Sequence, residues 1–280
     1  MKFEIIGSGG CVALPKPLCN CKICQEAREK GRPYSRYGCS LFLHDINLLI
    51  DTPEDIVHAI NNSNIQRIDT VLFSHLDPDH TLGFRVFEHL RLNWFEVSEG
   101  RECNNPIDVI AMPHVMEDLN AIQSRYGSFL DYYENVRNLI RRCKVEKYQK
   151  IDRIKISFIR IDRSTIFVFE SEGKKLIYAP CDVKPFPNED IFIDADVMII
   201  GNTIVGETLK DGYTLSEDNS LREELFSMSE VMDLKKKFNI KTVIVTHLEE
   251  DWGKSYDDYI NLEVQYDNVQ FAYDGMLINV

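Results

Sequence analysis

The feature that most constrains the fold is a short apolar run followed at once by a cluster of metal-ligand side chains. Residues 70–73 read Thr-Val-Leu-Phe, a pattern typical of a buried strand, and residues 75–80 read His-Leu-Asp-Pro-Asp-His. Imidazole nitrogens and carboxylate oxygens are common ligands of catalytic zinc-like ions. The alternative is a polar turn in which an aspartate caps the next helix. Four ligand-type residues within six positions favour the metal site.

The length and composition of the chain allow a large core that needs no disulfide scaffold. It has 280 residues, of which 44% are hydrophobic. No apolar run approaches the roughly 20 residues of a membrane span. Residues 1–7 read as a strand that leads into a glycine turn rather than as a signal peptide. We therefore expect a soluble cytoplasmic protein without a membrane partner.

The charge balance is strongly acidic, with 45 acidic against 32 basic residues and a net charge of −13. Such a charge disfavours broad electrostatic binding to nucleic acid. A local basic groove near Arg137, Arg141 and Arg142 stays open as an exception. We expect a small phosphorylated substrate rather than bulk nucleic acid, and a homodimer is compatible with the sequence.

Short apolar runs rich in β-branched residues predict many strands, at residues 2–6, 47–51, 69–73, 107–111, 154–161, 165–170, 174–179, 196–201, 242–246 and 268–273. Helix-like patterns lie at residues 54–61, 84–93, 116–126, 129–142 and 229–238. Strands and helices without strict alternation predict layered α/β architecture with sheets packed face to face. No repeat or linker divides the chain, so we predict a single domain, 1–280. Residues 114–150 are interpreted as a helical insertion, a kind of segment that often forms a wall over a site.

Two later strands also end in ligand-type side chains. Residues 175–182 read as a strand that ends at Asp182, and residues 242–248 as a strand that ends at His247. Each signal alone is weak, because aspartate and histidine often finish strands as turn residues. With the first cluster they form a set of strand-end ligands, and rigid sheets commonly present sites in this way.

The order of these motifs resembles that of the metallo-β-lactamase superfamily. The His-x-Asp-x-Asp-His pattern is similar to the His-x-His-x-Asp-His signature of that superfamily, with Asp77 in place of one histidine. The glycine turn at residues 7–10, the strand end at Asp51 and the closing Tyr-Asp-Gly-Met at residues 273–276 also fit. A narrower resemblance, to the PhnP-type phosphodiesterases and their PqqB-like relatives, is carried by residues 9–10, 19–24 and 27–28.

The resemblance implies a four-layer αββα sandwich with a metal site at one edge. Carried over residue by residue, it implies that Asp79, His80 and His247 hold one divalent ion. Asp182 would bridge this ion to a second one.

The pocket of the second ion, with His75 and Asp77, departs from the family pattern. The family also has a histidine shortly before the bridging aspartate, whereas residues 159–164 contain none and offer Asp162 instead. Added carboxylates shift the preference of a site from zinc toward manganese-like ions. They also leave bound water harder to deprotonate. The site therefore holds two ions of harder character, holds one ion, or binds a ligand without catalysis.

A second cluster of ligand-type side chains consists of Cys19, Cys21 and Cys24. The spacing Cys-x-Cys-x-x-Cys can wrap one tetrahedral zinc ion, and free thiols in a turn are the alternative. The resemblance implies a structural zinc completed by the residue three positions after the last active-site histidine, here Glu250. Cys39 is the alternative fourth ligand. The remaining cysteines, Cys11, Cys103, Cys143 and Cys181, are interpreted as ordinary thiols.

These observations predict a metal-dependent hydrolase that uses one or two divalent ions, zinc or manganese. Activated water would attack the substrate, oriented by Asp79 and Asp182, while the ions stabilise the developing negative charge. Asp51 would brace the metal-binding loop through hydrogen bonds. The narrower resemblance implies a phosphodiester substrate. The alternatives are a catalytically degenerate binding or accessory protein on the same fold, as in the PqqB-like relatives, and an RNA nuclease, which the acidic charge disfavours.

Overall fold

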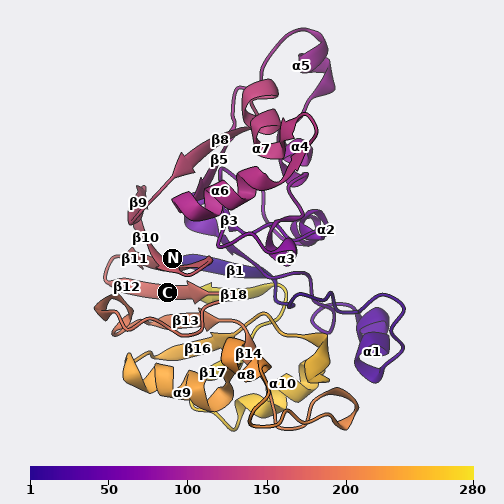
Figure 1. The fold of residues 1–280 in the computed structure, drawn as a ribbon, viewed down its shortest axis with the longest axis vertical. Helices are drawn as coiled ribbons and strands as arrows, with labels where there is room; N and C mark the ends of the chain where they lie inside the picture. Colours follow the sequence, from indigo (N-terminus) through magenta and orange to yellow (C-terminus); the bar gives the residue numbers. More distant parts are fainter.

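Two seven-stranded sheets packed face to face form the centre of the molecule, as the computed structural model of residues 1–280 shows (Figure 1). The first sheet has the strand order β18 (Met276–Asn279), β1 (Lys2–Gly7), β2 (Ser40–Leu43), β3 (Leu48–Ile50), β4 (Thr70–Leu72), β5 (Ile107–Ala111) and β8 (Ile140–Lys144). The strands from β3 to β8 run parallel to one another, so their carboxyl ends lie at the same edge of the sheet.

The second sheet has the strand order β17 (Val269–Phe271), β16 (Thr242–Val245), β13 (Val197–Ile200), β12 (Lys174–Ala179), β11 (Ser164–Ser171), β10 (Ile154–Ile161) and β9 (Tyr148–Ile151). The strands β12, β13, β16 and β17 are parallel. Two small sheets complete the set, β6 (Gln123–Ser124) with β7 (Gly127–Ser128) and β14 (Thr203–Ile204) with β15 (Phe226–Ser227).

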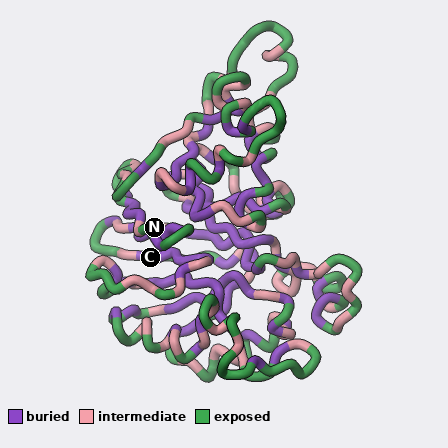
Figure 2. Tube along the Cα trace, viewed as in Figure 1, coloured by how far each residue is buried: buried purple, intermediate pink, exposed green.

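Apolar residues on both faces of the strands explain why the sheets stack. In β12, Leu176 and Tyr178 join the core between the sheets, whereas Ile177 joins the core beneath the outer helices. Alternate residues of a strand point to opposite faces, so a continuous apolar run fills both cores. Phe3 and Phe169 pack edge to face across the two sheets, with ring centroids 5.3 Å apart. The strands of both sheets are accordingly buried along most of their length (Figure 2).

Helices cover the two outer faces. The first sheet carries α2 (Ile56–Asn61), α4 (Val86–Arg91) and α6 (Pro113–Ala121), and the second carries α9 (Met228–Lys237) and α10 (Tyr256–Glu263). The shorter helices are α3 (Pro78–Thr81), α5 (Trp94–Ser98), α7 (Phe129–Asp131), α8 (Leu221–Glu224), the π-helical turn Tyr132–Val136 and the 3-10 turns His44–Ile46, Asp190–Phe192, Lys210–Gly212 and Glu250–Trp252. Helix α1 (Lys22–Lys30) stands apart beside the sandwich (Figure 1). The predicted four-layer αββα architecture is confirmed.

The local signals for α9 are complete. Ser227 and Glu230 form a reciprocal capping box at its start, and Lys235, Lys236 and Lys237 occupy its last turn, where the helix dipole favours positive charge. None of the helices is both long and apolar enough to span a lipid bilayer.

The predicted helix over residues 129–142 is wrong in its second half. The chain leaves the π-helical turn at Val136 and forms β8 and then β9, the edge strands of the two sheets. Strand β8 reads as polar because one side faces solvent, where Arg141 forms an ion pair with Asp108 of the neighbouring β5 at 2.6 Å. Charged side chains of this kind are usual on edge strands. Residues 114–150 are therefore only partly helical.

Candidate metal centre

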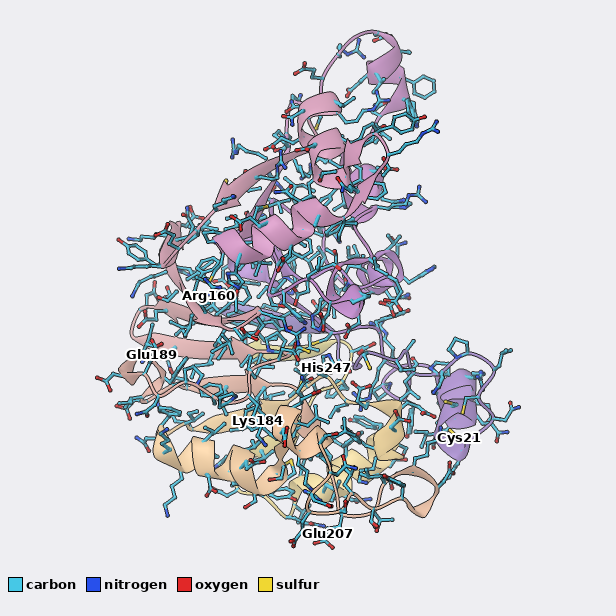
Figure 3. All side chains as sticks on the ribbon, viewed as in Figure 1. Cys21, Arg160, Lys184, Glu189, Glu207 and His247 are labelled. Carbon is cyan, nitrogen blue, oxygen red and sulfur yellow. The ribbon has the colours of Figure 1, made fainter.

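The predicted ligands gather where four strands end at one edge of the sandwich. Asp51 follows β3, the 75–80 cluster follows β4, Asp182 lies just beyond β12, and His247 lies just beyond β16. Figure 3 shows His247 near the middle of the molecule. Asp77 occupies the position before helix α3, but its side chain makes no capping hydrogen bond. The geometry therefore favours ligand chemistry over the helix-capping alternative.

Ligand-type side chains form three overlapping groups, and the potential ligand atoms in each group lie within 4.8 Å of one another. The groups are Asp79–His80–His247, His75–Asp77–Asp182 and His75–His80–Cys181. Because His75 and His80 each belong to two groups, the three groups form one continuous centre.

The first pocket is built from Asp79, His80 and His247. The carboxylate oxygen Oδ2 of Asp79 lies 3.2 Å from Nε2 of His247 and 3.5 Å from Nε2 of His80. The two imidazole rings stack with centroids 5.4 Å apart. His80 is fully buried, yet its Nε2 has no hydrogen-bond partner. A buried nitrogen without a partner is costly unless an ion or water occupies the site, so this pocket fits a metal ion.

The second pocket is built from His75, Asp77 and Asp182. Nε2 of His75 is also buried without a hydrogen-bond partner, and it lies 3.7 Å from Oδ2 of Asp77. The side chains of Asp77 and Asp182 are 48% and 27% exposed. Arg163 lies 3.7 Å from Asp182. This pocket is therefore the solvent-facing half of the centre.

One buried carboxylate, Asp51, orients both orphaned imidazoles. It accepts hydrogen bonds from the backbone N–H and the hydroxyl of Ser74, at 2.8 and 2.6 Å. Its Oδ2 lies 2.9 Å from Nδ1 of His80, and the Ser74 oxygen lies 2.8 Å from Nδ1 of His75. The proton of each ring therefore belongs on Nδ1, which leaves both Nε2 lone pairs for a metal.

The structure places two predicted ligands differently from the expected pattern. Asp162 lies in the exposed turn between β10 and β11 and belongs to none of the three ligand groups. Asp182 is grouped with His75 and Asp77 but not with the first pocket. The residue between the pockets is Cys181.

Sequence reasoning missed Cys181, which it interpreted as an ordinary thiol. The thiol is buried, lines the cavity above the centre and lies within ligand distance of both His75 and His80. The sequence feature that could have identified Cys181 as a ligand is its position at the end of a strand, one residue before Asp182. The backbone turns at Asp182, which has φ of 52°, so the two side chains take different directions.

The electrostatic field of the centre favours a bound cation. Burial alone would lower the pKa of His80, but the Asp51 carboxylate raises it well above the usual value. Burial alone would raise the pKa of the Cys181 thiol, but His247, His75 and His80 hold it well below the usual value. Cys181 in turn raises the pKa of His247. Excess negative charge of this kind attracts either protons or a metal ion.

A cavity of about 570 Å³ opens above the centre. Its floor includes Asp79, Cys181 and His247. Its apolar wall consists of Leu209, Tyr213, Leu215, Leu221, Leu225 and Trp252. Residues 114–150 contribute nothing to this cavity, and α7 lies in the upper part of the molecule, whereas His247 lies near its middle (Figures 1 and 3). The expectation that this segment forms the wall is therefore wrong, because residues 209–225 take that place.

The cysteine cluster closes around Glu250, as the resemblance implied. The carboxylate oxygen Oε1 of Glu250 lies 3.5, 3.2 and 3.4 Å from the sulfurs of Cys19, Cys21 and Cys24. Lys210 also contacts this oxygen, at 2.5 Å. The other oxygen of Glu250 is buried without a hydrogen-bond partner. Three thiols and an unsatisfied carboxylate fit a tetrahedral zinc ion.

Cys39, the alternative fourth ligand, lies outside this cluster. Its sulfur is buried 3.5 Å from the hydroxyl of Tyr178. Glu250 belongs to the 3-10 turn that begins three residues after His247, and Cys21 lies next to α1 (Figure 3). An ion here would therefore link the N-terminal segment to the loop that carries His247.

Substituting Cys21→Ser is expected to remove this zinc and to lower the melting temperature. If zinc is present at about 100 times its Kd, losing it costs about 2.7 kcal/mol of unfolding free energy. Elemental analysis and thermal denaturation measure the two effects. Cys143→Ser, at a half-buried thiol outside the cluster, is the control. Unchanged zinc content and melting temperature in Cys21→Ser would rule out the structural zinc.

Comparisons with known proteins place the fold. No protein-family model and no curated protein matches the sequence. A diphosphatase of the PhnP family superposes with a TM-score of 0.72 at 15% identity, over 100% of this chain and 97% of the diphosphatase. Zinc-bound PqqB from Methylobacterium extorquens superposes with a TM-score of 0.72 at 18% identity, over 100% of both chains. YhfI from Bacillus subtilis, a metallo-β-lactamase fold protein, gives 0.63 at 12% identity, over 99% of this chain and 98% of YhfI.

Proposed function

The chain has the metallo-β-lactamase fold, and from that premise we propose that it is a metal-dependent hydrolase of small phosphodiesters. The observation that carries the proposal is the pair of buried, partnerless imidazole nitrogens, Nε2 of His75 and Nε2 of His80. Both belong to ligand groups with carboxylates at the floor of a cavity large enough for a small substrate. Fold alone does not define an activity, whereas the side chains of this centre supply the chemistry that hydrolysis needs.

The residues of the chain divide the work of hydrolysis. Divalent ions at the centre would supply Lewis acidity, activating water and stabilising negative charge on the substrate. Asp79 and Asp182 both line the cavity, one in each pocket, so they can hold a water molecule and orient it toward a substrate. Asp51 keeps His75 and His80 in the orientation that presents both Nε2 atoms. The apolar side chains beside this floor reduce its contact with water, which strengthens the electrostatic interactions there.

The lining of the cavity supports a substrate of low charge. Its only lysine or arginine is Lys210, whose ammonium group is already 2.5 Å from Glu250. A substrate with several phosphate groups would therefore find no unpaired cation beyond the metal ions. Tyr213 and Trp252 offer apolar surface for an aromatic or aliphatic ester group. A phosphodiester, with a single negative charge, fits this combination.

The two pockets favour different ions. The first has two imidazoles and one carboxylate, a donor set typical of zinc. The second has one imidazole with the carboxylates of Asp77 and Asp182, a set that suits harder ions such as manganese. Both ions are therefore included in the test of activity.

The test is hydrolysis of bis(4-nitrophenyl) phosphate, compared with the doubly charged monoester 4-nitrophenyl phosphate. We expect turnover with added zinc or manganese, loss of turnover with a chelator, and a preference for the diester. The apolar wall and the lack of an unpaired cation are the reasons for that preference. Absence of turnover of either ester, in protein shown by elemental analysis to carry its ions, would refute the proposal.

The second candidate function is ligand binding without catalysis. It is favoured by the departure of the second pocket from the family pattern, with Asp77 in place of a histidine and Asp162 outside the centre. PqqB, which has a similar fold, was solved in a zinc-bound form. Tight binding of a phosphodiester to the metal-loaded protein without turnover would support this second candidate function.

A further inference from the structure

We propose that the thiolate of Cys181 is the metal ligand shared by the two pockets, in the position that the sequence pattern had suggested for Asp182. The inference rests on the metal centre of the proposed function but not on its hydrolytic activity. It makes the core of the centre the two imidazoles of His75 and His80 around one sulfur.

Cys181 lies between the two pockets. The sulfur of Cys181 and the ligand nitrogens of His75 and His80 lie within 4.8 Å of one another. His80 also belongs to the group with Asp79 and His247, and His75 to the group with Asp77 and Asp182. Cys181 is thus grouped with one histidine from each pocket, whereas Asp182 is grouped with the second pocket alone.

The thiol of Cys181 lies beside two buried imidazole nitrogens that have no hydrogen-bond partner. Nε2 of His75 and Nε2 of His80 are buried without hydrogen-bond partners, and these residues are only 1% and 0% exposed. Their Nδ1 atoms are held by Ser74 and Asp51, so the rings cannot turn away without breaking those bonds. Two fixed lone pairs and a buried sulfur leave a space that a cation would satisfy.

Close backbone packing restrains the segment that carries Cys181. A Cβ atom on Gly201 would lie 1.7 Å from the carbonyl oxygen of Pro180 and 2.8 Å from Cβ of His247. The residue before Cys181 therefore packs directly against the β13 end, close to the β16 end. Asp182, in contrast, has a side chain that is 27% exposed. Cys181 is the better anchored of the two side chains.

A thiolate ligand has a chemical consequence. Binding a divalent ion forms a sulfur–metal bond, and the proton that Cys181 and its neighbouring histidines share in the absence of the ion is released to solvent. Sulfur donors prefer zinc, cobalt or cadmium to manganese, which favours oxygen. The shared position would therefore bias the whole centre toward zinc, despite the carboxylates of the second pocket.

Cobalt substitution tests the assignment without any activity measurement. Metal-free protein is titrated with Co²⁺, and the sulfur-to-cobalt charge-transfer absorption is recorded for wild type, Cys181→Ser and Cys39→Ser. The cysteine cluster supplies a constant contribution in all three proteins, and Cys39 is a buried thiol outside every ligand group. We expect only Cys181→Ser to lose the part of the absorption that comes from the active site. Its zinc affinity at the active site is expected to fall about 100-fold, which is the largest loss usual for removing a residue that only supports a metal ligand.

A second variant and a second measurement cover the case in which Cys181→Ser does not fold. Cys181→Asp replaces sulfur by oxygen and is expected to keep an ion but to shift the preference from zinc toward manganese. In wild type, zinc is expected to protect Cys181 from alkylation, as read residue by residue by mass spectrometry, while Cys103, a half-buried thiol outside the cavity and the ligand groups, continues to react.

The outcomes separate this inference from the proposed function. An unchanged cobalt spectrum and unchanged zinc affinity in Cys181→Ser would overturn the role of Cys181 and leave the metal centre standing. Binding of cobalt by wild type at the cysteine cluster alone would overturn both.

Discussion

Replacing Asp79 by alanine is expected to lower kcat/KM for phosphodiester hydrolysis at least 1,000-fold, about 4 kcal/mol of transition-state stabilisation. Asp79 is the only carboxylate grouped with His80 and His247, and its Oδ2 lies within 3.5 Å of Nε2 of both rings. Without it the first pocket keeps its two imidazoles but loses the carboxylate whose negative charge helps to hold a cation. Steady-state kinetics with each metal, together with metal content, measure the effect.

The control for this substitution is Asp233→Ala, at an exposed aspartate of α9 outside the cavity and the ligand groups. It is expected to retain wild-type kinetics and metal content. Should Asp79→Ala keep its activity within tenfold of wild type, the first pocket would not be the site of the reaction.

Replacing Asp51 by alanine is expected to lower the free energy of unfolding by about 3 kcal/mol or more and the metal affinity by about 10–100-fold. The carboxylate is fully buried and holds the backbone N–H of Ser74, its hydroxyl and Nδ1 of His80. Alanine would leave three buried polar atoms without an acceptor. It would also release His75, which is held through the Ser74 hydroxyl.

Urea denaturation of the metal-free protein and competition with a zinc indicator measure the two effects of Asp51→Ala separately. Asp55→Ala is a matched control, because Asp55 accepts a hydrogen bond from the backbone N–H of Gly38 but touches no ligand. It is expected to lower stability and to leave metal affinity unchanged. Wild-type stability and affinity in Asp51→Ala would show that this carboxylate does not organise the centre.

The strands were predictable because both faces of most of them are apolar. Runs such as 154–161 and 174–179 carry buried residues at most positions and on both faces, and they appear as β10 and β12. Strands β8 and β9 were missed because they lie at sheet edges, where charged side chains hide the alternation, and the four-residue strands β2 and β18 were missed as well. Helix α10 was missed as well, since its single buried residue, Tyr259, leaves almost no apolar periodicity.

Those residues of the candidate site that directly follow a strand could be predicted from the sequence. Asp51, the 75–80 cluster and His247 all lie directly after strands, and the structure brings them together. The sequence could not decide between Cys181 and Asp182, because that depends on where the chain turns after β12. Neighbouring residues of an extended chain point in different directions, so a shift of one residue changes which side chain faces the site. Asp162 was chosen by chain order alone, and the β10–β11 turn carries it into solvent.

The apolar wall of the cavity had no local sequence signature. Its members are spread over residues 209–225 and the turn at Trp252. Tyr213 and Leu221 are exposed and Leu225 is only partly buried, so none of the three reads as a core residue. Only the folded chain brings them over the ligands. The substrate preference that we propose therefore rests on the three-dimensional structure and not on the motifs.

Anomalous X-ray scattering from crystals of the protein purified without chelator tests the central claim most directly. We predict a strong peak bounded by Asp79, His80 and His247, close enough to Cys181 for a metal–sulfur bond. The cysteine cluster around Glu250 provides an internal check that metal was available. A peak at that cluster with none among Asp79, His80 and His247 would contradict the account.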